Sequence, residues 1–361
     1  MRETKKEIKL HPEVFKAIRE ASGYSPEEIA KKLKTSTDKV VSVEEGQTSF
    51  TITQIKKLAE IYKRPLVAFF SSSIPELPES PDYRINRERR LTPNVYLAKR
   101  RAYYLVEKIE ELSSIRSQIP SFSETLKADE LAREFRKSLN VKLIKHRKPD
   151  EMLSYYKKLL EDSLGIIIIE YPLKANDVRA FSIYSELSSI VLNEDDKSMI
   201  KLFSLFHEIC HLIRKTGGIC SLDIENESQD EECYCNSFAA EFLVPSDDLK
   251  VECKKHREFT DDVINQLMEA YGVSKQVIML RLLGFGYVDK KRYKAFKIKL
   301  EEGIKQKQFG RKNWDRVFLN RVGNMSLREV KNAYNKKVIT FYEASSILGL
   351  KAKYAEEFIS V

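Results

Sequence analysis

Cysteine, histidine and long apolar runs are all scarce in this chain of 361 residues. Its longest apolar runs, at 165–169 and 65–70, are far shorter than the roughly 20 residues that cross a bilayer. The charged start, MRETKKEIKL, lacks the apolar segment of a secretion signal and predicts a cytoplasmic location. The five cysteines are then expected to be thiols. These absences argue against a membrane protein and against a disulfide-stapled secreted protein.

Charge is a weaker guide, because a net charge of +9 over this length is a mild bias. Basic residues are concentrated at 81–101, with seven against two acids, and at 289–316, with eleven against four. The segment 222–232 instead holds six acids and no base. The basic segments are compatible with solvated helix faces and with nucleic-acid contact, and both interpretations stay open.

The chain is long enough for two or three domains. Residues 12–70 show short helical patterns between tight turns, and Ser25-Pro26-Glu27-Glu28 has the form of a capping box. Several short helices in this space are typical of a helix-turn-helix bundle. We therefore expect a helix-turn-helix domain of five-helix type over 1–71, a proline-rich linker over 72–93, a second domain over 94–250 and a helical region of unknown role over 251–361.

The second domain has a mixed pattern. Segments 165–171 and 181–192 are rich in β-branched and apolar residues and predict strands, while 197–215 and 231–243 predict helices. The whole chain is therefore expected to be mostly helical, of the α+β class, with one small sheet.

Helix 197–215 contains the sequence His207-Glu208-Ile209-Cys210-His211, an HExxH motif. Histidines at positions i and i+4 project from one face of a helix and can hold one Zn²⁺, and Glu208 can reach a water on that metal. The motif predicts His207 and His211 as metal ligands and Glu208 as the general base. Gly217-Gly218 supplies the expected stop of the helix.

Catalytic zinc needs a third protein ligand, and the candidates lie in helix 231–243. Glu232 and Asn236 share a face of this helix, so we expect Glu232 to bind the metal and Asn236 to hold a ligand through a hydrogen bond. Glu231 is expected to face solvent, and Glu241 is a weaker rival for the ligand role.

Other residues near the motif leave alternatives open. The five cysteines, at positions 210, 220, 233, 235 and 253, are interpreted as small buried residues, as a redox-sensitive group, or as metal ligands in the case of Cys233 and Cys235. Tyr184 and Tyr234 are both candidates to stabilise an oxyanion, and the sequence does not choose between them.

These motifs also resemble a known family. HEICH, followed from Glu232 to Pro245 by E-x-x-C-N-x-F-A-A-E-F-L-V-P, is similar to the ImmA/IrrE metallopeptidases, whose second motif reads E-x-x-A-N-x-F-A-A-E-L-L-M-P. Residues 19–25 and 54–70 resemble the Xre-type helix-turn-helix often fused to this family, and 81–84 resembles the junction. The resemblance implies a gluzincin-like fold, a zinc endopeptidase, and cleavage of a helix-turn-helix repressor. Its departures, including Cys235, fall at packing positions.

The N-terminal helices suggest DNA binding only weakly. The expected reading helix, 37–45, offers Thr37, Lys39 and Ser42 but also Asp38, Glu44 and Glu45. Recognition helices usually bring Arg, Gln or Asn to base edges. Dimeric DNA binding and a protein-docking or self-regulatory role both stay open, and the sequence does not specify the oligomeric state.

The leading hypothesis is a cytoplasmic zinc metalloendopeptidase that cleaves an Xre-type repressor and so derepresses its genes. The alternative is a DNA-binding transcription regulator whose metallopeptidase-like domain acts as a sensor or binding scaffold. A complete ligand set together with Glu208 favours the enzyme, because a scaffold needs no base.

Overall fold

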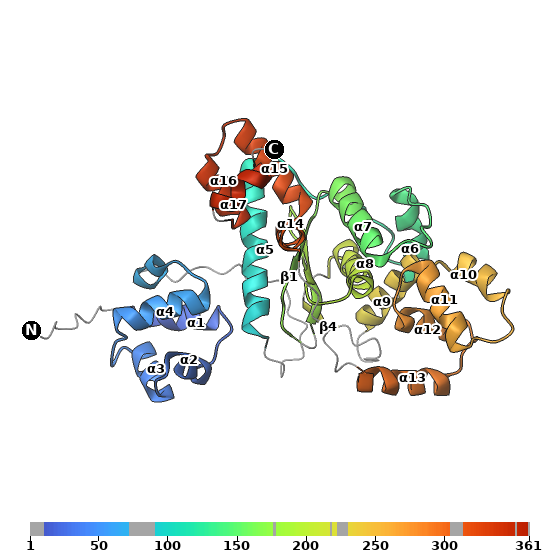
Figure 1. Ribbon diagram of the computed structural model, residues 1–361, viewed down its shortest axis with the longest axis horizontal. Helices are drawn as coiled ribbons and strands as arrows, with labels where there is room; N and C mark the ends of the chain where they lie inside the picture. The colour runs from blue at the N-terminus through green and yellow to red at the C-terminus, as the bar shows by residue number, and fades with distance from the viewer. Residues whose placement is uncertain are drawn as a thin grey trace, which may run out of the picture. The chain divides into compact units, whose positions relative to one another are not determined.

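The computed structural model describes residues 11–71, 91–175, 178–216, 219–221, 230–303, 313–350 and 352–359 (Figure 1). Its internal contacts divide the chain into two compact units. The first comprises Met1–Ser80, Arg87–Tyr103 and Leu173–Ala175, and the second comprises Pro81–Asn86, Tyr104–Pro172 and Asn176–Val361. Most of the expected linker, residues 72–90, and most of the acidic segment, 222–229, lie outside the described residues.

The first unit contains the expected helical bundle. Its elements are α1 (Pro12–Glu20), α2 (Pro26–Leu33), α3 (Thr37–Glu44), α4 (Ile52–Tyr62), the 3-10 helix η1 (Leu66–Phe70) and the first part of α5 (Pro93–Leu112). Ser25 accepts from the backbone N–H of Glu28, and the Glu28 carboxylate accepts from the backbone N–H of Ser25, so the predicted capping box is confirmed. Phe15, Phe50 and Phe69 lie at the centre of the core that these helices enclose.

The second unit is built on a four-stranded mixed sheet with the strand order β1-β3-β2-β4. Its strands are β1 (Ile167–Tyr171), β2 (Val178–Ile183), β3 (Ser189–Asn193) and β4 (Ile219–Ser221). β1 is parallel to β3, whereas β2 is antiparallel to both β3 and β4. The single strand expected over 181–192 is wrong. The hydroxyl of Ser188 accepts from the backbone N–H of Ser185 and donates to its carbonyl, which forms a turn that divides this segment into a hairpin.

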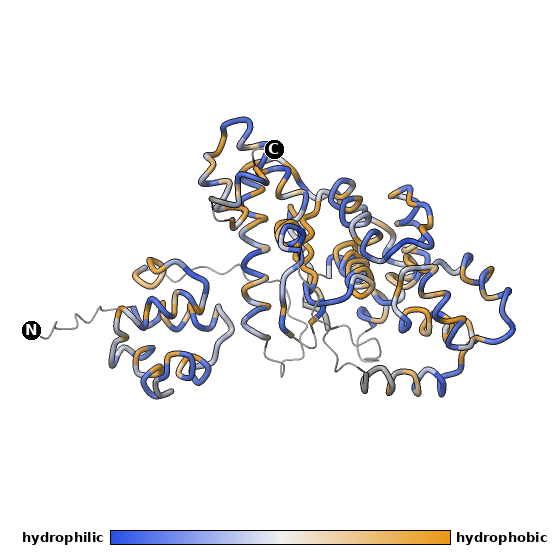
Figure 2. The backbone as a smooth tube through the Cα atoms, viewed as in Figure 1, coloured by the Kyte–Doolittle hydropathy of each residue, from blue (hydrophilic) through white to orange (hydrophobic). Residues whose placement is uncertain are grey.

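Helices pack on the sheet or beside it and share one hydrophobic core with it. They are α6 (Ala128–Ser138), α7 (Pro149–Leu164), α8 (Ser198–Arg214), α9 (Asp230–Leu243), α10 (Ser246–Cys253), α11 (Asp261–Tyr271) and α12 (Lys275–Gly284), followed by α13 (Lys290–Gly303). α8 packs on β2 and β3 and also against α7 and α9, where Phe206 and Phe242 stack with ring centroids 3.9 Å apart. The strands and α8 form the most hydrophobic part of this unit (Figure 2). The helices expected over 197–215 and 231–243 are therefore confirmed, and the core continues through the helices that follow them.

The remaining helices lie at the β1 edge of the sheet. They are α14 (Trp314–Val322), α15 (Asn324–Asn335), α16 (Phe341–Leu348) and α17 (Ala352–Ile359). α14 and α15 both pack against β1, and α15 also contacts α7 (Figure 1). Gly323, at the corner between α14 and α15, has a φ of +81°, and a Cβ there would lie 2.9 Å from the carbonyl oxygen of Ile168. The fold is mostly helical with one small sheet, as expected. Within the described part of the chain, we find no helix with the length and hydrophobicity to span a bilayer.

Candidate metal site

The two histidines of the HExxH motif lie in the second half of α8, which is buried along most of its length. The sequence predicts that this helix stops at Gly217-Gly218. It ends earlier, and those two glycines lie outside the described residues. It ends at Lys215, which adopts a left-handed conformation with φ 56°. The N–H of Thr216 then bonds the carbonyl of His211 at 2.9 Å, the pattern of a Schellman motif. This earlier turn brings the Thr216 side chain back beside His211.

His207, His211 and Glu232 converge at one point. The Nε2 atoms of the two histidines are 3.1 Å apart. From α9, Glu232 places Oε2 3.2 Å from Nε2 of His207 and Oε1 3.5 Å from Nε2 of His211. The three ligand atoms lie within 4.8 Å of one another, and both histidines are almost fully buried. The three residues expected as ligands thus form one group that could hold a metal ion.

Hydrogen bonds on the far side of each ring orient the two imidazoles. Nδ1 of His207 lies 2.9 Å from Oδ1 of Asn236, as expected from the sequence. Because an amide oxygen only accepts, His207 carries a proton on Nδ1, which leaves Nε2, on the side of Glu232, as the nitrogen that can bind a metal. Nδ1 of His211 lies 2.9 Å from the hydroxyl of Thr216. This hydroxyl donates to a carboxylate of α9 and therefore accepts from Nδ1 of His211. The Nε2 atom of His211 is thus left on the side of His207 and Glu232.

That carboxylate belongs to Glu231. The expectation that Glu231 faces solvent is wrong. Its side chain is 17% exposed, and Arg214 donates to both of its oxygens, at 2.6 and 2.9 Å. The chain of contacts Arg214–Glu231–Thr216–His211 holds the second candidate ligand in place. Sequence reasoning missed Arg214 and Thr216, because nothing in the motif marks the last residue of the helix or the residues just after it. Glu241 is not a rival ligand. It is buried against Arg281 and Ser246.

Glu208 follows His207 on α8, next to the candidate ligands, and is 1% exposed. Burial raises its pKa to about 7, against the opposing effects of His207 and of the Ser182 hydroxyl on β2. Its Oε2 makes no hydrogen bond within the described residues. Burial and the neighbouring His207 lower the pKa of His211 to about 4, which keeps this imidazole neutral at pH 7. A neutral imidazole is the form that binds a metal.

The residues present fit a catalytic metal. Two imidazole nitrogens and one carboxylate converge from two helices, with an acceptor behind each imidazole and a further carboxylate nearby. Three nitrogen and oxygen ligands are typical of zinc sites that keep one coordination position open. A second group, formed by His211, Glu231 and Cys235, also has close donor atoms. Its Glu231 already neutralises Arg214, so the first group is the better site.

The structure also shows where the two candidate tyrosines and the cysteines near the motif lie. The hydroxyl of Tyr234 donates to the carbonyl of Leu126 at 2.7 Å and is not directed at the site. Tyr184 lies just after β2 with its side chain exposed, and its role stays a prediction. Cys210, Cys235 and Cys253 are buried thiols, which agrees with their interpretation as small packing residues. The side chain of Cys220 lies outside the described residues.

In the first unit, the acidic character of α3 is smaller than its sequence suggests. Glu44 is 7% exposed and accepts from Arg19, with Nε 2.5 Å from Oε1 and Nη2 2.8 Å from Oε2. It is therefore part of the interior and not of the surface that α3 presents to a partner. Of the three acids counted against DNA binding, Asp38 and Glu45 remain exposed.

The comparisons with known proteins agree with this geometry. Residues 161–283 match the peptidase M78 family, described as an IrrE N-terminal-like domain, and this range includes β1 to β4, α8 and α9. Residues 15–69 match a helix-turn-helix family, which implies DNA binding. No curated protein matches the chain. The resemblance stated from the motifs is confirmed in both of its parts.

Proposed function

We propose that this chain, which carries an IrrE N-terminal-like peptidase domain and an N-terminal helix-turn-helix domain, is a zinc-dependent endopeptidase. One observation carries the proposal. The convergent donors of His207, His211 and Glu232 have beside them a buried carboxylate, Glu208, with an oxygen that no described residue satisfies. A structural metal site or a binding scaffold has no need of that carboxylate.

The roles of the residues follow from their places. His207, His211 and Glu232 hold the metal, and Asn236 and Thr216 keep the two imidazoles in the right tautomer. When bound, zinc supplies a Lewis acid that polarises the scissile carbonyl and acidifies a water in its open position. Glu208 takes the proton of the attacking water and gives it to the leaving nitrogen. Its pKa of about 7 suits a group that accepts and returns a proton near neutral pH.

The proposed substrate is an Xre-type helix-turn-helix repressor, whose cleavage derepresses its genes. The support for it is the resemblance to the ImmA/IrrE metallopeptidases and the fused helix-turn-helix domain, which implies DNA binding. A peptidase that binds DNA is brought close to repressors bound nearby.

Incubation of the zinc-loaded protein with a purified repressor encoded beside its gene tests the proposal. We expect discrete cleavage products by mass spectrometry, and none after treatment with a chelator. The alternative is a DNA-binding regulator whose peptidase-like domain is a sensor or scaffold. Zinc binding and DNA binding without cleavage of any such repressor would favour that alternative.

A further inference from the structure

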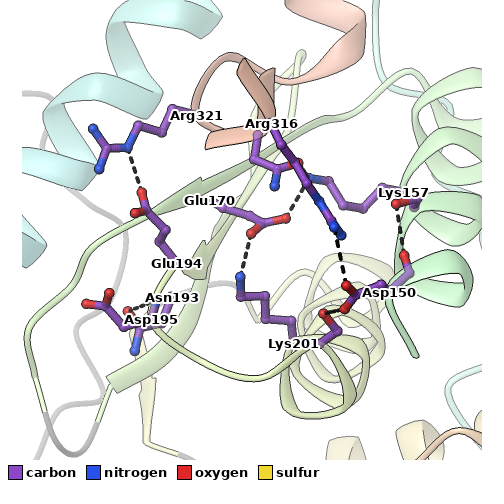
Figure 3. A network of polar contacts seen from close by, with 12 residues as sticks. Asp150, Lys157, Glu170, Asn193, Glu194, Asp195, Lys201, Arg316 and Arg321 are labelled. Atoms are coloured by element: carbon purple, nitrogen blue, oxygen red, sulfur yellow. Dashed lines mark hydrogen bonds and ion pairs between the residues drawn. The ribbon is translucent and has the colours of Figure 1, made fainter. Parts of the chain in front are cut away.

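A buried carboxylate between two lysines joins β1, α7 and the metal-site helix α8 (Figure 3). Glu170 on β1 accepts from Nζ of Lys157 at 2.9 Å through Oε1 and from Nζ of Lys201 at 2.6 Å through Oε2. Their exposed fractions are 2% for Glu170, 3% for Lys157 and 8% for Lys201. A buried charge costs free energy unless it is paired, so any movement that separates these charges is penalised. The three side chains therefore hold one relative position of β1, α7 and α8, whereas apolar contacts would allow several.

Lys201 lies on the same face of α8 as Glu208. The two residues are seven positions apart, which on an α-helix is about two turns with an offset of roughly 20°. They are therefore separated by roughly 10 Å along the helix axis and point to the same side. Any rotation of α8 that moves Lys201 away from Glu170 also moves Glu208.

The residues that contact Lys201 and Glu208 lie on one face of the sheet. Glu170 pairs with Leu192 of β3, which pairs with Ala180 of β2. In the neighbouring row, Ile190 pairs with both Ile168 of β1 and Ser182 of β2. Because alternate residues of a strand share a face, Glu170 and Ser182 lie on the same side of the sheet. α8 crosses that side with Lys201 bonded to Glu170 and with Glu208 beside Ser182.

The C-terminal helices complete this arrangement. Oδ1 of Asn320 on α14 accepts from Nζ of Lys157 at 3.1 Å, which gives that lysine a second partner. At the start of α8, Asp150 of α7 bonds both the hydroxyl of Ser198 and, at 3.2 Å, the guanidinium of Arg316 on α14. Helix α14 thus supports both the carboxylate bridge and the first turn of α8.

We propose that Glu170 is a positioning residue for the metal site: its bond to Lys201 sets the rotation of α8, and so places Glu208 and turns His207 and His211 toward Glu232. The proposal rests on the proposed function for the role of Glu208, but its effect on metal binding is independent of cleavage. It also gives the C-terminal helices a role in the peptidase, because α14 supports the bridge.

The test compares Lys201→Met with Arg328→Met. The first change keeps a long side chain and leaves Glu170 paired one to one with Lys157. The second breaks an ion pair between α15 and Asp162 of α7 that does not involve α8. Zinc affinity is measured by competition with a chromophoric chelator, and circular dichroism confirms folding. We expect about tenfold weaker zinc binding for Lys201→Met and wild-type binding for Arg328→Met.

A second pair of variants covers the case in which Lys201→Met does not fold. Glu170→Gln is compared with Glu161→Gln, a buried carboxylate of α7 that accepts from Asn324 and from the backbone of Met325, both on α15. Wild-type zinc affinity in the folded Lys201→Met or Glu170→Gln protein would overturn the proposal. An equal loss in its control would also overturn it, because the effect would then be general destabilisation.

Cleavage assays separate this proposal from the proposed function. If the repressor is cut, kcat should fall further than KM changes in Lys201→Met, because the misplaced group acts in the chemical step. If the wild-type protein binds zinc and cuts nothing, the endopeptidase proposal fails, while the affinity comparison still decides the role of Glu170.

Discussion

The hydrogen bond between Asn236 and His207 makes the most quantitative prediction. Both groups are buried, with exposed fractions of 3% and 0%, and Oδ1 lies 2.9 Å from Nδ1. When a metal holds Nε2, the proton of His207 must stay on Nδ1, and Asn236→Ala leaves that N–H without its acceptor. Without a metal the ring can place its proton on Nε2, facing Glu232. The penalty therefore falls on the metal-bound state.

The size of the effect follows from the cost of an unsatisfied buried group, about 1–3 kcal/mol. Since 1.4 kcal/mol corresponds to a factor of ten, the Kd for zinc should rise roughly 5- to 150-fold in Asn236→Ala. Asn236→Asp keeps an acceptor and should bind zinc at least as tightly as the wild-type protein. Ser237→Ala is the matched control, because Ser237 is the next residue on α9 and its hydroxyl donates to the backbone carbonyl of Cys233.

Competition with a chromophoric chelator at fixed pH measures these affinities. A folded Asn236→Ala protein that binds zinc within twofold of the wild-type Kd would refute the reasoning, because the hydrogen bond would then not orient the ligand. A comparable loss in Ser237→Ala would show that α9 is sensitive to any change.

Three further predictions concern stability. Glu44→Ala leaves the buried guanidinium of Arg19 without its carboxylate and should destabilise α1 to α4 by about 3–5 kcal/mol, measured by hydrogen exchange in the intact chain; unchanged protection would contradict this. Gly323→Ala should lower Tm more than Gly286→Ala, because both have positive φ but only Gly323 meets a backbone carbonyl; equal shifts would contradict the contact. Two neighbouring lysines lower the pKa of Glu252 from 4.5 to about 2, so its stabilisation is present above pH 4.5 and is lost as pH falls toward 2. Glu252→Gln should therefore flatten the acid limb of a stability–pH curve, and an unchanged limb would contradict the shift.

Features that lie within one helical turn could be predicted from the sequence. The capping box of Ser25 and Glu28 and the i, i+4 histidines depend only on helix geometry, and both are found. The hydrogen bond between Asn236 and His207 could also be predicted, because Asn236 lies one turn after Glu232 on the same helix face.

Features that depend on contacts between distant segments could not be predicted. A count of acids treated Glu44 as exposed, but it pairs with Arg19, 25 positions earlier. The two glycines after α8 are the usual helix stop, yet Lys215 takes the left-handed position because the resulting turn is stabilised by Thr216. The bond between Glu170 and Lys201 depends on how α8 crosses the sheet, which no local pattern specifies.

The most direct test of the account compares Glu208→Gln with the wild-type protein for zinc content and for cleavage of the neighbouring repressor. Glutamine keeps the size of the side chain but cannot take a proton. We expect the same zinc content in both proteins, and cleavage slower by a factor on the order of 10² to 10⁴ in the variant. Cleavage by Glu208→Gln at the wild-type rate would contradict the assignment of the base, and with it the central claim.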